Sequence, residues 1–188
     1  AYEEAIELSY ATGDEFGAAG AQANLAQVLV QRGLLEAAAK YLEPALEVHV
    51  RLGTRSSQAW ALNVLGDLRR AEGDPAAATD CHGRGLHIFR QTGDRDGQAW
   101  LNNSLGEDAQ AAGDPAEAAA RHAEALALAV EIADREQEAR AHRGLAGASR
   151  ALGDLPAARD HYRRAHAVWS ELGSPEAARM DDILRGLA

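Results

Sequence analysis

A glycine-centred turn recurs at regular intervals along this chain of 188 residues. The glycines form two interleaved series of equal period: Gly33, Gly73, Gly113 and Gly153; and Gly13, Gly53, Gly93 and Gly173, with Ala133 at the one gap. An Asp follows most of these glycines, as at Asp74 and Asp114. Gly adopts the left-handed conformation that ends a helix, and Asp caps the start of the next helix. Two such turns in every period predict a helical hairpin that is copied head to tail.

The turns divide the chain into two alternating kinds of helix, A and B. We expect helix A over about residues 17–32, 57–72, 97–112, 137–152 and 176–187. We expect helix B over about residues 1–12, 35–52, 75–92, 115–132 and 155–172. The repeats would then span 17–52, 57–92, 97–132 and 137–172, with partial units at 1–12 and 176–187. This pattern predicts a single all-α domain, a right-handed superhelical solenoid of antiparallel helix pairs.

Equivalent positions of the repeats carry the same kinds of side chain. One column holds only leucine: Leu25, Leu65, Leu105 and Leu145. Another holds only alanine: Ala38, Ala78, Ala118 and Ala158. Small residues in register let paired helices approach closely, and the leucines fill the space around the contact. We therefore expect both columns to lie in the core.

These columns resemble the tetratricopeptide repeat (TPR). The matching residues are Leu65-Gly66, Gly73-Asp74, Ala78 and Leu86 in one repeat, and Leu105-Gly106, Gly113-Asp114, Ala118 and Ala125-Leu126 in the next. The period, which runs from Gly33 to Gly73, is longer than that of the usual TPR and is similar to that of the LGN/Pins and kinesin-light-chain subgroup. The composition also resembles the C-terminal arrays of actinobacterial AfsR-like and other NTPase-TPR regulators.

Charge and composition limit the class of protein. The net charge of −10 argues against direct binding of nucleic acid, which needs a basic face. No apolar run of about 18 residues is present, so we expect no membrane span. The single Cys81 fits a reducing, cytoplasmic compartment. Because the chain starts inside an expected helix, without Met, we expect it to be a fragment of a larger bacterial protein.

The TPR resemblance implies that helix A lines a concave groove for an extended peptide or a helix. Carrying the groove columns over to this sequence gives a candidate set: Gln27, Trp60, Asn63, Asp67, Arg70, Trp100, Asn103, Glu107, Arg140, Arg143 and Arg150. Trp, Asn and an acid stand at i, i+3 and i+7 in two successive repeats, so we expect them to share one face of helix A. With acids at its centre and arginines beyond, this groove would suit a ligand with a basic centre and an acidic end. The alternative is that both Trp side chains pack between repeats and that their polar neighbours are solvated.

The histidines and carboxylates show no pattern of an enzyme or a metal site. His82 and His122 stand at equivalent positions of successive repeats, where a packed aromatic is usual, so we expect both in the core. No histidine pair has the i, i+4 spacing with a third ligand that would indicate zinc. We therefore expect no enzyme, no cofactor and no metal.

Three functions remain open. The first is a protein- or peptide-binding scaffold within a bacterial regulatory or signalling protein. The second is a ligand-sensing receptor module for a small signalling peptide or metabolite. The third is a self-association module that forms weak homodimers through its end helices, where Ile6, Leu8 and Met180 provide apolar side chains.

Overall fold

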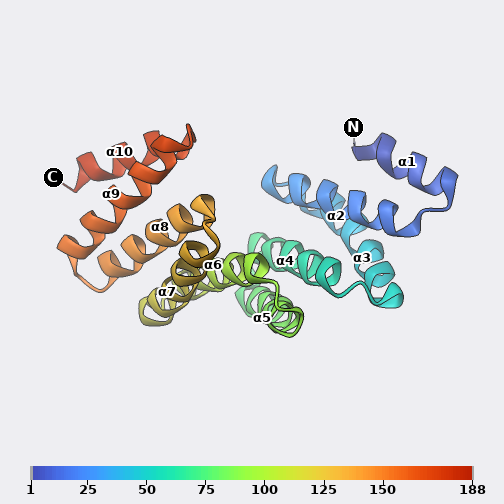
Figure 1. Cartoon of the computed structure of the whole chain (residues 1–188), viewed down its shortest axis with the longest axis horizontal. Helices are drawn as coiled ribbons and strands as arrows, with labels where there is room; N and C mark the ends of the chain where they lie inside the picture. The colour runs from blue at the N-terminus through green and yellow to red at the C-terminus, as the bar shows by residue number, and fades with distance from the viewer. Residues whose placement is uncertain (1, 188) are drawn as a thin grey trace. The chain divides into compact units, whose positions relative to one another are not determined.

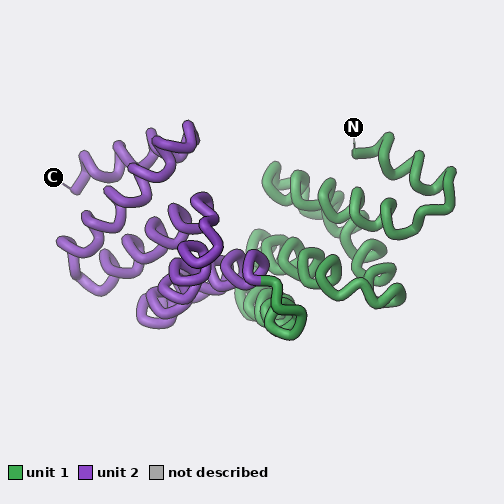
Figure 2. The backbone as a smooth tube through the Cα atoms, viewed as in Figure 1, with its two compact units in different colours: residues 1–94 green, residues 95–188 purple. Residues whose placement is uncertain are grey.

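The computed structural model describes residues 2–187, and these residues form ten α-helices and no strand (Figure 1). The all-α prediction is confirmed. The helices fall into two compact units, residues 1–94 and residues 95–188 (Figure 2). The two units are described separately below.

Unit 1 contains the first five helices: α1 (Tyr2–Thr12), α2 (Glu15–Gln31), α3 (Leu35–Leu52), α4 (Arg55–Ala71) and α5 (Pro75–Thr92). Each helix packs against the next one, and α2 also contacts α4. Its core contains Ala26, Ala38, Leu42, Ala61, Val64 and Leu68. The helices of type A thus touch one another as well as their own B partner.

Unit 2 repeats this arrangement with α6 (Arg95–Ala111), α7 (Pro115–Ile132), α8 (Arg135–Ala151), α9 (Leu155–Glu171) and α10 (Glu176–Gly186). Here α6 contacts α8 directly, so two helices of type A lie side by side. The alanine column is fully buried in both units, as expected for the points where A and B helices approach closely. In the leucine column, Leu105 is buried and the other three leucines are half-buried.

The turns carry the predicted capping groups. The Asp14 carboxylate accepts a hydrogen bond from the Gly17 amide at 2.9 Å, and Asp134 accepts one from Gln137 at 3.0 Å. The preceding Ala133 takes the left-handed conformation, at φ 59°, that glycine takes in the other turns. The helices α2, α4, α6 and α8 begin at residues 15, 55, 95 and 135, each two residues earlier than expected. In α2 and α8 the reason is that the Asp directly before the helix caps it.

The two terminal helices differ in how well their apolar side chains are covered. In α1, Ile6 is buried, whereas Leu8 is 67% exposed. In α10, Met180 is buried and Ile183, Leu184 and Leu187 pack on the cluster that contains Tyr162 and Trp169. The i, i+3, i+4 and i+7 spacing of these four residues puts them on one side of α10.

None of the helices described within residues 2–187 has the length and apolar content needed to cross a membrane.

Candidate protein-binding face

The part of the candidate set that lies in unit 1 comes from α2 and α4. Gln27 is half-buried on α2. Trp60 is half-buried on α4, and its ring meets the edge of Phe89 of α5 with 5.1 Å between the ring centroids. Further along α4, Asp67 accepts a hydrogen bond from Arg70. Trp60 therefore packs partly within its own repeat and keeps part of its surface open.

The part in unit 2 is centred on Glu107 of α6. Its two carboxylate oxygens accept hydrogen bonds from Nε and Nη2 of Arg140, both at 2.9 Å. Arg143 donates a third, at 3.0 Å. The Arg140 guanidinium also lies over the Trp100 ring, 5.5 Å from its centroid, and donates to the Ser104 hydroxyl at 3.2 Å. Such two-pronged contacts fix a guanidinium in both position and orientation.

Arg143 extends this arrangement towards α9 and α10. Its guanidinium lies 5.7 Å from the centroid of the Trp169 ring and 3.8 Å from the Glu176 carboxylate. The side chain nevertheless remains 37% exposed, and Arg150, in the last turn of α8, is exposed. We call the surface formed by Trp100, Glu107, Arg140, Arg143 and Arg150 the arginine face. It combines an indole, a carboxylate and three guanidinium groups.

The expectation that Asn63 and Asn103 line an open groove is wrong, because both side chains are buried. The Asn103 amide donates to the Gln137 carbonyl and to its side-chain oxygen, both at 3.1 Å, and its own oxygen lies 2.9 Å from Nδ1 of His122. These bonds join α6, α7 and α8. Asn103 therefore connects two repeats and does not face a ligand.

His122 is buried against the backbone of two other helices. A Cβ on Gly106 or Gly144 would lie 2.6 Å or 2.3 Å from its ring, so only glycine fits at both positions. Since Asn103 presents an oxygen, Nδ1 of His122 carries the hydrogen. Burial lowers the pKa of His122 to about 4, which keeps the ring neutral at pH 7.

The expected core positions of His82 and His122 are confirmed, since both are at most 1% exposed. Their hydrogen bonds were not foreseen. Nε2 of His82 lies 3.2 Å from the backbone carbonyl oxygen of Asn63, whereas Nδ1 of His122 meets the side-chain oxygen of Asn103. The same Asn and His positions are thus in contact in both repeats, through different atoms. The equal sequence spacing of Asn and His in the two repeats was the signal from which these contacts could have been predicted.

A second histidine contact joins α8 and α9. Nδ1 of His142 lies 3.1 Å from Nδ1 of His161, and the ring centroids are 5.3 Å apart. The two ring nitrogens are thus within reach of an N–H···N hydrogen bond. Burial lowers the pKa of both histidines and favours this neutral pair. Within residues 2–187 no group of three or more His, Cys, Asp or Glu side chains is arranged to hold a metal ion.

Comparison with known families identifies this architecture. The profile described as "Tetratricopeptide repeat" matches residues 17–91 and 97–171, which together cover most of the chain. The chain belongs to the tetratricopeptide-repeat family. TPR arrays are scaffolds for protein–protein interaction, and so is this TPR chain. No protein with a curated description matches it significantly.

Several solved structures share this TPR fold. BtubC (BKLC) from P. vanneervenii has a TM-score of 0.81 and 18% identity, over 99% of this chain and 78% of the other. A Rap protein in complex with Competence and Sporulation Factor has a TM-score of 0.79 and 13% identity, over 92% of this chain and 48% of the other. A signal transduction ATPase with a tetratricopeptide repeat sensor, from Pyrococcus horikoshii, has a TM-score of 0.77 and 19% identity, over 96% and 28%. The chain thus spans about half or less of the length of the last two proteins.

Proposed function

We propose that this TPR chain binds an extended peptide or a helix of a partner protein on the arginine face of unit 2. The observation that carries the proposal is the position of Glu107 between Arg140 and Arg143, beside the half-buried Trp100. Arg and Trp are enriched among the residues that dominate binding energy at protein interfaces. An indole that is held in place by a guanidinium loses little freedom when a partner covers it.

The partner segment is acidic in this proposal. A basic ligand centre, as the charge pattern of the sequence favoured, would meet a Glu107 carboxylate that already accepts hydrogen bonds from two arginines. Arg143 and Arg150 extend the positive charge beyond this carboxylate; Arg143 is partly accessible and Arg150 is exposed. Acidic side chains of a partner would add to these guanidinium groups without displacing an internal bond.

The setting we propose is a bacterial regulatory or signalling protein in the cytoplasm. A Rap protein complexed with Competence and Sporulation Factor and a signal transduction ATPase with a TPR sensor have similar folds, which supports a regulatory role. At sequence identities of 13% and 19%, these two proteins share only the fold with this chain. The regulatory setting is therefore part of our proposal.

Selection from a random peptide library displayed on phage tests the peptide site. We expect the wild-type chain to enrich acidic peptides. We expect Trp100→Ala and Arg143→Ala each to weaken binding of the selected peptides by tenfold or more. Arg163→Ala, which changes an exposed arginine on α9, is the matched control and should bind like the wild type. Peptides that bind both face variants as tightly as the wild type would refute the site, provided that circular dichroism shows all variants to be folded.

A further inference from the structure

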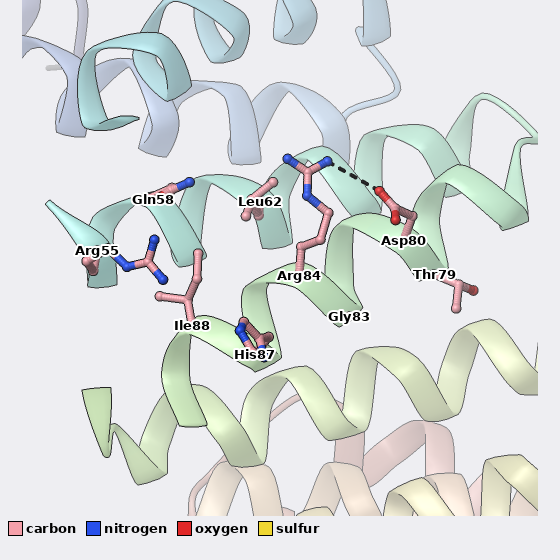
Figure 3. A pocket seen from close by; sticks show the side chains of 9 residues that line it. All are labelled: Arg55, Gln58, Leu62, Thr79, Asp80, Gly83, Arg84, His87 and Ile88. Carbon is pink, nitrogen blue, oxygen red and sulfur yellow. Dashed lines mark hydrogen bonds and ion pairs between the residues drawn. The ribbon is translucent and has the colours of Figure 1, made fainter. Parts of the chain in front are cut away.

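Unit 1 contains a cavity of about 420 Å³ between α4 and α5, on residues that take no part in the candidate groove (Figure 3). Leu62 of α4 and Ile88 of α5 contribute apolar surface to it, and both are nearly fully buried. Polar side chains, among them Gln58, Arg84 and His87, complete the lining. Its size lies within the range of small-molecule pockets, and its mixture of an apolar base with a few polar groups is also typical of them.

Hydrogen bonds outside the cavity hold part of this lining in place. Arg55 donates to the side-chain oxygen of Gln91 at 2.6 Å, and the amide nitrogen of Gln91 lies 2.9 Å from Nε2 of His87. His87 therefore accepts a hydrogen bond at Nε2 and carries its own hydrogen at Nδ1. Gln91 thus orients a cation and a neutral hydrogen-bond donor at the same cavity.

The charges at the cavity favour an anion. Two guanidinium groups, of Arg55 and Arg84, stand against one carboxylate, of Asp80, in a chain whose net charge is −10. Arg84 and Asp80 form an ion pair at 3.3 Å, and their side chains are 58% and 64% exposed. Exposed pairs of this kind contribute little stability, so an incoming anion can replace Asp80 at Arg84.

Gly83 provides a second, independent observation. It lies in the middle of α5, where glycine is less favourable than any residue except proline. No neighbouring atom lies within 4 Å of the place where its Cβ would be, so packing does not require a glycine. The equivalent positions of the other repeats carry side chains: Glu43, Ala123 and Arg163. The absence of a side chain at Gly83 leaves space over the backbone, and Gly83 is part of the cavity lining.

We propose that the cavity between α4 and α5 binds a small organic anion, a carboxylate or a phosphate on a compact apolar body. Arg55 and Arg84 hold the anionic group, and the Nδ1–H of His87 donates a hydrogen bond to it. The apolar body lies over Gly83, against Leu62 and Ile88. This site shares no residue with the arginine face.

Nuclear magnetic resonance of the ¹⁵N-labelled chain tests this site with four probes: benzoate, phenyl phosphate, neutral benzamide and cationic benzamidine. We expect at least one of the two anions to shift the Gly83 amide and its neighbours saturably, with an affinity at least tenfold above those of benzamide and benzamidine. The ratio between benzoate and phenyl phosphate then tells whether the site prefers a carboxylate or a phosphate.

Three variants locate the binding. Gly83→Leu fills the cavity and should abolish the shifts, whereas Ala123→Leu places the same side chain at the equivalent position of α7 and should leave them intact. Arg84→Gln should weaken anion binding at least fivefold. The proposal is overturned if neither anion shifts these amides, if benzamidine binds as well as the anions, or if the Gly83→Leu variant binds like the wild type.

Discussion

A pair of glycines on α8 offers a direct test of how the third and fourth repeats pack. A Cβ on Gly144 would lie 2.3 Å from the ring of His122, whereas a Cβ on Gly147 would meet only the tip of Gln110, at 3.8 Å. Alanine is more favourable than glycine in a helix interior by about 1 kcal/mol. The two substitutions therefore share the gain in helix propensity and differ in the contact that they create.

The expected stabilities follow from this difference. Carbon atoms make contact at about 3.5–4 Å, so His122 would have to move by roughly 1 Å in the Gly144→Ala variant. It has little room, because it is 1% exposed, bonded to Asn103 and bounded by Gly106 on its other side. Overpacking costs about 1–3 kcal/mol, and a strained hydrogen bond adds about 1 kcal/mol. We expect Gly144→Ala to lose about 1–3 kcal/mol and Gly147→Ala to gain up to about 1 kcal/mol.

Urea denaturation followed by circular dichroism measures both values. In a His122→Ala background the clash is absent, so Gly144→Ala should become neutral or stabilising there. Equal stability of the Gly144→Ala and Gly147→Ala variants in the wild-type background would refute the proposed packing of the His122 ring.

Three further predictions concern pH, the core and the chain ends. His122 should contribute a fall of about 2 kcal/mol in the free energy of unfolding between pH 7 and pH 5. Burial lowers its pKa from 6.5 to about 4, so the unfolded chain binds more protons than the folded chain in this window. In urea titrations at both pH values, the His122→Gln variant should lose this share of the pH dependence, and a variant with the full pH dependence of the wild type would contradict the prediction. Leu105→Ala should cost about 2–5 kcal/mol, and a loss below about 0.5 kcal/mol would show that its contacts are weak. Weak homodimers should form through apolar side chains at the chain ends, such as the exposed Leu8. Their affinity should increase with salt, because salt screens the repulsion between chains of net charge −10. Sedimentation that shows only monomer at high protein and salt concentrations would contradict this.

Much of the fold could be predicted because its signals are local. Each Gly–Asp turn ends one helix and caps the next within a few residues, so the spacing of the turns gives the number and order of the helices. The starts of α2, α4, α6 and α8 were expected two residues too late, because the residue that follows the turn glycine or alanine stands directly before the helix. At the other end of the chain, Met180, Ile183, Leu184 and Leu187 of the last helix pack on one cluster, a contact between helices that no turn signal reports.

The binding face could be predicted only in part, since helical spacing fixes angles around a helix and not which angle faces solvent. At about 100° per residue, an acid at i+7 lies about 20° from a Trp at i, whereas an Asn at i+3 lies about 60° away. That larger rotation turns Asn103 towards the next repeat, where Gln137 accepts its hydrogen bonds. The long-range pairing of Glu107 with Arg140 and Arg143 had no local signal beyond opposite charge.

The buried bridge from α7 to α8 restricts which repeats can follow one another. An in-frame loss of residues 95–134 would bring Asn63 and His82 to the positions of Asn103 and His122, so Gln137 and Gly144 would meet the same side-chain types. A loss of residues 135–174 would instead bring Ala177 to the position of Gln137 and Leu184 to the position of Gly144. The Asn103 amide would then lose its side-chain acceptor, and the Leu184 side chain would lie against the His122 ring, where only glycine fits. We expect the chain without residues 95–134 to unfold at a higher temperature than the chain without residues 135–174. Recombination between copies of a repeat could therefore shorten this gene at one joint and not at the other.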